Sequence, residues 1–350
     1  MKAAVYKGPG RVLLEIVQPP VLLNPTDAII DVMLTAICGT DLHPYRGHIH
    51  DFKKDCILGH EFTGIVKAVG SEVKNIKVGD RVVASDVIAC GSCWYCKKGL
   101  HYQCEKASLF GYGEVVGEYT PGGQAEMVRV PFAETVLHKI PDQISDEEAL
   151  LVSDILSTGF TCTEEADIQH NDIVAVVGGG PLGLMISMCA QLYHPKMIIV
   201  IEPNDTRRKK AEELGAIALS PGQLDKFKKI TEKRGADIVF EAVGVDKTLK
   251  MSLDLVRSGG KIVCAGSHKS ENFPLNTRIS FAKEISIKFA VGNPIKYSRK
   301  LLQLIGEKKL HPTKIITHRL SFDEVEEAYR IFNEQEALKV ILQVKREKHE

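Results

Sequence analysis

The chain has 350 residues, of which 44% are hydrophobic and 26% charged, a balance typical of a globular protein too long for a single core. Lys plus Arg equals Asp plus Glu at 45 each, so no net charge draws the chain to nucleic acid or to an anionic membrane. The N-terminus shows no targeting pattern and no apolar run is long enough to span a bilayer, so we expect a two-domain cytoplasmic protein with reduced cysteines.

The first 150 residues are predicted to be rich in β-structure. Residues 1–6, 28–34 and 81–84 are short segments with β-branched residues, and Gly, Pro and Asp interrupt the chain between them. Strands of this length separated by turns are typical of a small barrel.

After residue 150 the pattern changes to strands that alternate with helices. Strands are predicted at 172–177, 197–201, 237–240 and 261–265, and helices at 182–192, 206–214 and 247–256. This alternation predicts a parallel α/β sheet. A helix near 323–333 and a strand near 340–344 are expected to rejoin the first domain. We therefore expect one domain over 1–152, completed by 290–350, and a second over 153–289.

A glycine-rich turn follows the first strand of the α/β region. Gly178, Gly180 and Gly183 fit the pattern G-x-G-x-x-G, open a predicted helix, and precede an acidic residue, Glu202, about 20 residues further on. Such a turn lets the backbone and the helix N-terminus approach a pyrophosphate. The Glu202 carboxylate would repel a 2′-phosphate, so NAD is favoured, while Arg207 and its neighbour Arg208 keep NADP as the alternative. A tight turn without a ligand is the structural alternative.

Four cysteines lie within fifteen residues, in a segment rich in Gly and Lys: Cys90, Cys93, Cys96 and Cys104. Four thiolates can surround one Zn²⁺ tetrahedrally and leave no open position, which is typical of a structural site. Disulfides and surplus thiols are the alternatives, and a reducing compartment disfavours the first.

A second set of candidate metal ligands is dispersed along the chain. Cys38 begins the segment Cys-Gly-Thr-Asp-Leu-His, His60 and Glu61 follow Gly59, and Asp154 lies near the expected domain junction. A lone Cys or His is more often a packed core residue than a ligand. The spacing alone cannot bring these residues together.

The sequence resembles the zinc-containing medium-chain alcohol dehydrogenases over essentially its whole length. The resemblance rests on Gly59-His60-Glu61-x2-Gly64-x5-Gly70, with Cys38 upstream and both the four-cysteine segment and the glycine-rich turn downstream. It implies a GroES-like β-barrel domain and a Rossmann domain with a doubly wound parallel sheet. It also implies an enzyme that transfers a hydride between a small alcohol and NAD.

The same resemblance implies a role for each dispersed residue. Cys38, His60 and Asp154 would hold a catalytic zinc, with Glu61 as an occasional or more distant ligand, so that the chain would hold two zinc ions. Many relatives have a second Cys where Asp154 stands, and the Asp form resembles secondary-alcohol and formaldehyde dehydrogenases. Asp41 would orient His60.

The resemblance also implies a proton path and further cofactor contacts. Thr40 would take the substrate proton, and His43 would pass it to solvent, a task suited to a side chain whose ordinary pKa is near neutrality. Contacts with the cofactor are implied, with less support, at Thr158, Leu182, Arg207, Val243 and Ala265. A homotetramer or homodimer is expected from the family.

Several alternatives stay open at this point. The substrate can be a secondary alcohol, formaldehyde, a diol such as 2,3-butanediol, a polyol or threonine, and the sequence does not show its stereochemistry or the physiological direction. A zinc-free quinone reductase of the same superfamily would lack Cys38, His60 and Asp154. A non-catalytic NAD-binding relative would be free to lose Thr40 or His43, yet both are present.

Overall fold

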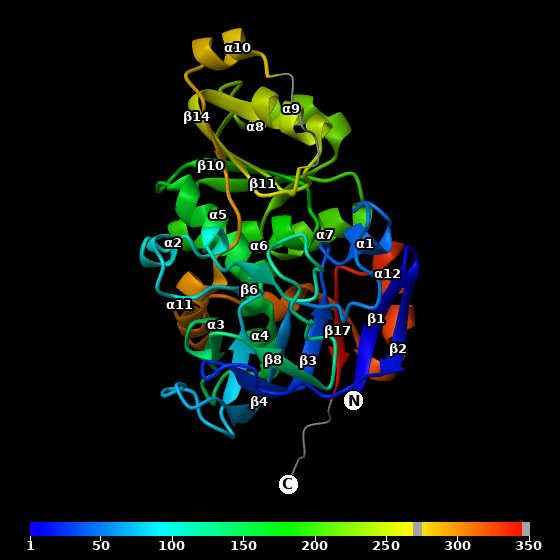
Figure 1. Cartoon of the computed structure of the whole chain (residues 1–350). Coiled ribbons are helices and arrows are strands. Elements are labelled where there is room, and N and C mark those ends of the chain that lie inside the picture. The colour runs from blue at the N-terminus through cyan, green and yellow to red at the C-terminus, as the bar shows by residue number, and fades with distance from the viewer. Residues whose placement is uncertain (269–274, 345–350) are drawn as a thin grey trace. The chain divides into compact units, whose positions relative to one another are not determined.

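The computed structural model describes residues 1–268 and 275–344, and the chain forms two compact units (Figure 1). The first unit combines Met1–Asp154 with Asn293–Glu350, and the second is the continuous segment Ile155–Gly292. Residues from both ends of the sequence therefore share one core. Within the described residues, every helix is too short or too polar to cross a membrane.

The first unit is built on a seven-stranded sheet with the order β16-β17-β3-β4-β5-β9, in which β8 also pairs with β3. All neighbours are antiparallel except β16 and β17. These strands are β3 (Ala28–Ile37), β4 (Phe62–Val69), β5 (Arg81–Ala84), β8 (Met127–Val130), β9 (Leu137–Lys139), β16 (Ile316–Ser321) and β17 (Lys339–Gln343). Two antiparallel pairs accompany the sheet: β1 (Lys2–Gly8) with β2 (Arg11–Ile16), and β6 (Val87–Ile88) with β7 (Ser108–Leu109). The strands expected at 1–6, 28–34, 81–84 and 340–344 are present.

The helices of this unit are mostly short. They are α1 (Leu42–Tyr45), α2 (Trp94–Lys97), α3 (Ala133–Val136), α4 (Asp146–Leu150), α11 (Pro294–Gly306) and α12 (Val325–Asn333). A capping box starts α4, in which Ser145 and Glu148 satisfy each other's backbone N–H groups. Because α4 leads directly toward Asp154, this cap helps to fix where that residue lies.

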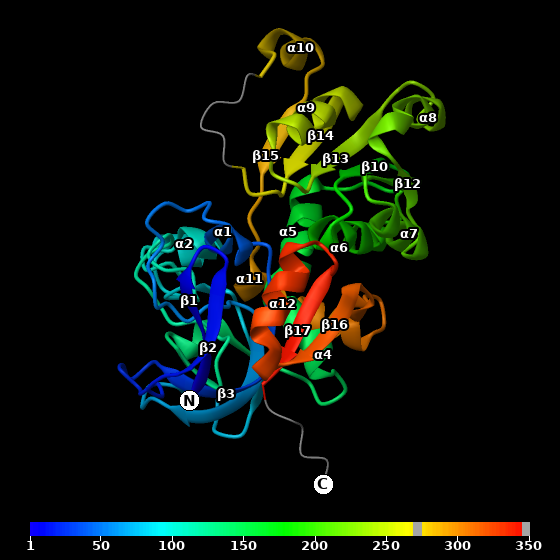
Figure 2. The ribbon, with the colours of Figure 1, turned by 90° about the vertical axis from the view of Figure 1, so that its right-hand side faces the viewer.

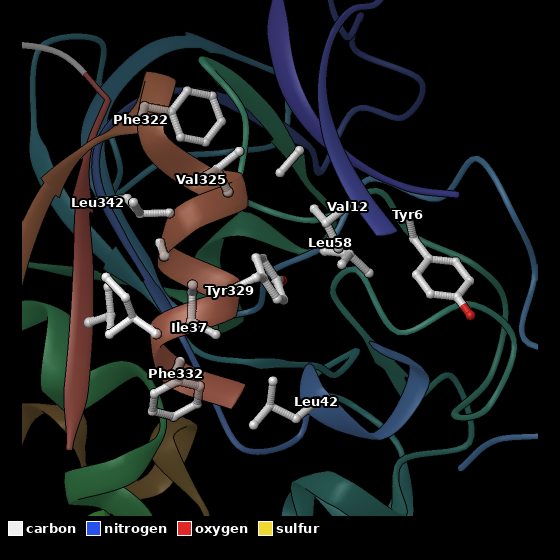
Figure 3. Close-up of a cluster of buried hydrophobic side chains, with 14 of the residues drawn as sticks. Tyr6, Val12, Ile37, Leu42, Leu58, Phe322, Val325, Tyr329, Phe332 and Leu342 are labelled. Carbon is white, nitrogen blue, oxygen red and sulfur yellow. The ribbon is translucent and has the colours of Figure 1, made fainter. Parts of the chain in front are cut away.

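Helix α12 contributes one wall of the core of the first unit. Val325, Tyr329 and Phe332 are spaced at i, i+4 and i+7, so they share one face of the helix. Figure 3 shows these side chains in one cluster with Leu342 of β17 and with Val12 from the β1–β2 hairpin. Each large apolar side chain buried in this way contributes roughly 1.5–3 kcal/mol. The C-terminal segment is therefore an integral part of the first unit.

The second unit is a six-stranded parallel sheet with the order β12-β11-β10-β13-β14-β15. Its strands are β10 (Ile173–Val177), β11 (Met197–Ile201), β12 (Ile217–Leu219), β13 (Ala236–Glu241), β14 (Val256–Cys264) and β15 (Ser286–Phe289). Its helices are α5 (Ile155–Ala166), α6 (Pro181–Ala190), α7 (Asp205–Glu213), α8 (Leu224–Ile230), α9 (Asp246–Leu255) and α10 (Thr277–Ala282). The four strands and three helices predicted from the alternation are all present, and the sheet is parallel as predicted.

Helices cover both faces of this parallel sheet. Figures 1 and 2 show α5 and α6 on one face and α8 and α9 on the other. All five residues of β10 are buried, which explains why this strand is a continuous apolar run rather than an alternating one. The strand order reverses between β10 and β13, and ligands of such sheets bind outside the carboxyl ends of the strands at this point.

Candidate metal and cofactor sites

Two neighbouring strands bring Cys38 and His60 together. Cys38 directly follows β3, and His60 and Glu61 directly precede β4. These strands are antiparallel, with Thr35 opposite Phe62, so the end of one meets the beginning of the other. All three side chains are buried, so the sheet register places a thiol, an imidazole and a carboxyl group at one protected position.

Asp154 reaches the same position from a distant part of the sequence. It follows a 3₁₀ turn at Leu151–Ser153, whose last carbonyl accepts a hydrogen bond from the Asp86 N–H at 3.1 Å. Its Oδ2 lies 3.1 Å from Cys38 Sγ and 3.4 Å from His60 Nε2. One ligand atom from each of Cys38, His60, Glu61 and Asp154 lies within 4.8 Å of the others. The structure thus brings together the residues that the spacing alone could not.

The chemistry of this cluster fits a zinc ion. Thiolate, imidazole and carboxylate are the groups that bind Zn²⁺ in proteins. Three atoms around the cluster are buried without a hydrogen-bond partner among residues 1–268 and 275–344: Asp41 Oδ1, His60 Nδ1 and Glu61 Oε2. Asp41 Oδ1 lies 3.4 Å from His60 Nδ1, on the opposite side of the ring from Asp154. This is where a carboxylate that orients a metal-binding histidine is expected.

The electrostatics show that the cluster attracts positive charge. Burial acts to lower the pKa of His60, but Asp41 and Asp154 outweigh burial and raise that pKa well above its usual range. Burial likewise acts to raise the pKa of Asp154, yet His60 holds it below its usual range. Burial and the Asp154 charge raise the pKa of the Cys38 thiol to about 12. A divalent cation meets the same demand for positive charge and allows the thiolate to form.

Lys339 of β17 adds a buried cation that the sequence did not lead us to predict. Its Nζ lies 2.6 Å from Glu61 Oε1, and both side chains are almost completely buried. Burial acts to lower the pKa of Lys339, but the charge of Glu61 outweighs burial and raises it. The available signal was a lone lysine beside the apolar run Val340–Leu342, which also fits an exposed end of a strand.

The four-cysteine segment forms a second cluster in the same unit. Its sulfur atoms lie within 4.8 Å of one another, and none of the nine cysteines, all of which lie in described residues, is in a disulfide. Backbone N–H groups point at the sulfurs: Cys90 donates to Cys104 Sγ at 3.3 Å, and Cys93 donates to Cys90 Sγ at 3.4 Å. Burial acts to raise the pKa of Cys90, but hydrogen bonds to its sulfur outweigh burial and lower that pKa to about 6. Hydrogen bonds from backbone N–H groups also lower the pKa of Cys93, whereas burial raises the pKa values of Cys96 and Cys104. The four sulfur atoms together offer the donor set of a four-cysteine zinc site.

Thr40 and His43 lie in the turn that follows Cys38 and in helix α1. The His43 N–H donates to the Thr40 carbonyl oxygen at 3.1 Å, and both side chains are half-buried. Asp41 Oδ2 accepts a hydrogen bond from the Cys38 N–H at 2.9 Å, which fixes the turn itself. The predicted proton path therefore starts within a few residues of Cys38 and lies on the same rigid turn.

The glycine-rich turn has the geometry that its glycines require. Gly178 has φ +104°, which an L side chain rarely adopts. A Cβ at Gly183 would lie 1.9 Å from the Gly178 carbonyl oxygen, so only glycine allows the helix to pack this close to the strand. Gly180 is extended and precedes Pro181 at the start of α6. The backbone is thus left open at the helix N-terminus, where a pyrophosphate binds in folds of this type.

Glu202 lies beside this turn at the end of β11. Its Oε2 accepts a hydrogen bond from the Gly179 N–H at 2.7 Å, and its Oε1 accepts one from the Asn204 N–H at 2.9 Å. The carboxylate is 4% exposed, so it presents only a small surface to a ligand. Arg207 Nη1 lies 3.8 Å from the point where a Cβ would lie if Gly180 were replaced by a residue with a side chain. The acidic residue and the arginine that are predicted to determine the choice between NAD and NADP therefore both border the turn.

The remaining predicted cofactor residues also belong to the second unit. Val243 follows β13 and is 47% exposed, and Ala265 follows β14. Leu182 lies in the first turn of α6, and Thr158 lies on α5. Val243, Ala265 and the glycine-rich turn are at the carboxyl edge of the sheet, because the carboxyl ends of parallel strands meet there.

Comparison with known protein families gives two matches. Residues 24–142 match the alcohol dehydrogenase GroES-like domain, and residues 181–307 match the zinc-binding dehydrogenase family. A zinc-type alcohol dehydrogenase-like protein, AdhB of Bacillus subtilis, is 32% identical, with 98% of this chain and 100% of that protein covered. The chain therefore belongs to the zinc-containing medium-chain alcohol dehydrogenase family and is an oxidoreductase.

Solved structures agree with the fold. The alcohol dehydrogenase TADH from Thermus sp. ATN1 is 36% identical and superposes with a TM-score of 0.95 over 99% of this chain and 100% of that one. The alcohol dehydrogenase rspB from E. coli CFT073, complexed with NADH, is 29% identical, with a TM-score of 0.86 over 98% and 99%. A zinc-binding dehydrogenase from Sinorhizobium meliloti 1021, bound to NADP, is 27% identical, with a TM-score of 0.85 over 98% and 99%. The predicted combination of a GroES-like domain and a Rossmann domain is confirmed.

Proposed function

We propose that the enzyme transfers a hydride between a small secondary alcohol and NAD, with the corresponding ketone as product. The observation that carries this proposal is the convergence of Cys38, His60 and Asp154, with Sγ and Nε2 at 3.1 and 3.4 Å from one carboxylate oxygen. Three protein ligands leave one coordination position for a substrate oxygen, which is the arrangement of a catalytic zinc site. When bound, zinc supplies a Lewis acid and NAD supplies the hydride acceptor.

The residues of this chain then have distinct tasks. Cys38, His60 and Asp154 hold the metal, and their two negative charges balance its two positive ones. Asp41 orients the imidazole of His60 from the far side and accepts the Cys38 N–H, so it fixes two ligands at once. Because the whole set is buried, its attraction for a cation is stronger than it would be in water.

Proton removal falls to Thr40 and His43 in this proposal. The Thr40 hydroxyl would accept the proton of the substrate hydroxyl group while giving its own proton to the nicotinamide ribose, from which the half-buried His43 would pass a proton to solvent. Histidine suits the second task because it exchanges protons near neutral pH.

Cofactor binding falls to the glycine-rich turn of the second unit. The N-terminus of α6 would bind the pyrophosphate, and Glu202 would accept hydrogen bonds from the adenosine ribose. Glu202 supports NAD rather than NADP because its charge repels a 2′-phosphate. Thr158, Leu182, Val243 and Ala265 would contact the rest of the cofactor.

A second zinc in the four-cysteine segment would be structural. The thiolate-stabilising N–H groups described above support this assignment, and four sulfur ligands leave no position for substrate. We also propose a cytoplasmic homo-oligomer, because the family habit and the exposed Phe289 on the edge strand β15 point in the same direction.

The test is a metal count combined with a substrate panel. Zinc per chain is measured by mass spectrometry in the wild type, in Asp154→Ala and in Asp154→Cys, and each is assayed with NAD⁺ and 2-propanol, ethanol, 2,3-butanediol, sorbitol, threonine and formaldehyde. We expect about two zinc ions in the wild type, about one and no turnover in Asp154→Ala, and two in Asp154→Cys, because a thiolate replaces the carboxylate.

Other outcomes have separate meanings. Full metal content and full activity in Asp154→Ala would show that Asp154 is not a ligand. That result would also contradict the assignment to the secondary-alcohol or formaldehyde dehydrogenase subgroup. NADH binding without turnover of any panel substrate would favour a non-catalytic relative. Preference for a diol, a polyol, threonine or formaldehyde would support the proposed mechanism but show that the substrate is not a simple secondary alcohol.

A further inference from the structure

A lysine is buried beside the proposed zinc ligands. Lys339 is 1% exposed and Glu61 is not exposed at all, and their side chains meet at 2.6 Å. The same ammonium group donates a hydrogen bond to the Ile37 carbonyl oxygen at 3.2 Å. Removing two charges from water is costly, and replacing such a pair by apolar residues is often neutral or stabilising. The pair therefore calls for a role other than stability.

Sheet register places this ammonium between the two segments that carry ligands. Strand β17 pairs antiparallel with β3, with Val340 opposite Ile37, so Lys339 lies at the end of β3. Ile37 immediately precedes Cys38, and Glu61 immediately follows His60. The Lys339 ammonium thus contacts the backbone of the residue before Cys38 and the side chain of the residue after His60.

The charges of the cluster explain why Glu61 needs a partner. The Cys38 thiolate and the Asp154 carboxylate already balance a zinc ion. Glu61 offers a further carboxylate oxygen within the same 4.8 Å group, and its Oε2 has no hydrogen-bond partner within the described part of the chain. A buried carboxylate of this cluster that has one oxygen without a partner is available to become a fourth protein ligand, and four protein ligands give a closed site.

We propose that Lys339 is a positioning residue that retains Glu61 as its counter-ion and so keeps the fourth metal position open for substrate. Without the ammonium, the uncompensated charge of Glu61 is satisfied by the metal, and the site closes. This inference rests on the proposed function, since it requires a metal held by Cys38, His60 and Asp154.

The experiment measures access to the metal without relying on turnover. Zinc is exchanged for Co²⁺, and imidazole is titrated while the visible spectrum of the cobalt is recorded. The four-cysteine segment gives a constant background because it has no open position. The variants are Lys339→Met, Lys339→Arg and the double variant Lys339→Met/Glu61→Gln, and circular dichroism checks that each is folded.

The expected results separate charge from packing. Imidazole shifts the spectrum of the wild type, and Lys339→Met raises the apparent Kd of imidazole by about tenfold or more, because Glu61 competes for the position. Lys339→Arg, which keeps the charge, and the double variant, in which Glu61 is neutral, both return to within about twofold of the wild type. If Lys339→Met does not fold, Lys339→Gln takes its place, because it also removes the positive charge beside Glu61.

Four results would overturn the proposal. An unchanged imidazole response in Lys339→Met would show that the lysine does not control coordination, although the proposed function would stand. Failure of the double variant to recover would show that the effect does not act through Glu61. Loss of cobalt from a folded Lys339→Met protein would make the lysine a requirement for metal retention instead. A wild type without an imidazole-sensitive cobalt centre would overturn both this inference and the open site of the proposed function.

Discussion

The role proposed for Glu202 is to determine which dinucleotide binds at the glycine-rich turn. Its carboxylate is held by the Gly179 and Asn204 N–H groups, and Arg207 lies nearby. Glu202→Gln keeps an oxygen acceptor but removes the charge that repels a 2′-phosphate. We expect the ratio of kcat/KM for NAD⁺ to that for NADP⁺ to fall by about tenfold or more, as steady-state kinetics with both cofactors would show.

Arg207 provides the control for that measurement. In the Glu202→Gln background, Arg207→Ala should remove the gained use of NADP⁺, because no cation then remains beside Gly180 to bind the phosphate. If the single variant keeps the wild-type preference, Glu202 serves only to hold the turn through its two backbone hydrogen bonds.

His138 makes stability depend on pH in a predictable direction. Burial, aided by the charge of Arg299, lowers the pKa of this side chain to about 4. In the unfolded chain its pKa is near 6.5, so between these values the unfolded state binds more protons and stability falls as the pH is lowered. By pH 4 this group alone should cost about 1–3 kcal/mol.

The comparison that isolates this effect is with His138→Gln, which does not titrate. Urea unfolding between pH 7 and pH 4 should show a smaller loss of unfolding free energy in the variant than in the wild type. Parallel pH profiles for the two proteins would show that His138 is protonated at no cost in the folded state.

The turn from β10 to α6 gives a matched pair of glycine substitutions. A Cβ at Gly183 would meet a carbonyl oxygen at 1.9 Å, whereas a Cβ at Gly180 has only an arginine side chain at 3.8 Å. Gly183→Ala should therefore lower the thermal midpoint by several degrees and also weaken NADH binding. Gly180→Ala should leave the midpoint nearly unchanged but weaken NADH binding, because its methyl group points to where a pyrophosphate would lie.

Calorimetry and NADH fluorescence titration measure the two effects separately. Unchanged NADH affinity in Gly180→Ala would place the pyrophosphate elsewhere. Unchanged stability in Gly183→Ala would mean that the helix can move away from the strand without cost.

The elements that the sequence revealed are those whose apolar residues repeat clearly. The four predicted strands of the parallel sheet are short apolar runs between charged or glycine-rich segments, and all are present. Helix α5 was not predicted, because Ser157, Thr161 and Thr163 are buried on it and interrupt the apolar period. Two of these hydroxyls bond to carbonyls of the same helix, which makes their burial tolerable.

The residues in and around the metal cluster likewise include some that could be predicted from the sequence and others that could not. The resemblance supplied Cys38, His60, Glu61 and Asp154 as candidate ligands, and the structure places all four together. Lys339 and the Tyr329–Gln124 hydrogen bond beside Asp41 could not be predicted, because lysine and glutamine are rarely buried and their burial depends on long-range packing. The resemblance supplied the candidate ligands and Asp41, whereas the lysine that neutralises Glu61 and the glutamine that contacts Asp41 come from distant segments.

At the scale of the whole molecule, strand β15 is a sheet edge that exposes a phenylalanine. It is the last strand of its sheet, Phe289 is 63% exposed, and Phe281 on the adjacent α10 is 87% exposed. An edge strand with exposed apolar side chains is a template for pairing with a second copy. We expect the purified protein to be a homo-oligomer and Phe289→Lys to dissociate it, as sedimentation velocity at micromolar concentration would show.

A control for this substitution lies in the other unit. Val78 is also exposed, at 63%, but lies on a loop, so Val78→Lys should leave the sedimentation profile unchanged. If Phe289→Lys sediments like the wild type, the assembly does not use this edge. A monomeric wild type would contradict the homo-oligomer itself.

The late position of Lys339 in the chain has a consequence for synthesis. During translation the three proposed metal ligands and Glu61 leave the ribosome first, then the entire second unit, and only afterwards the strand that carries the lysine. Until then Glu61 has no counter-ion, so a nascent chain that meets zinc early presents four protein ligands to it. Under the proposed role of Lys339, a productive centre would therefore form only when the last strand joins the sheet, and a chain released before this strand is made would bind metal without leaving a position for substrate.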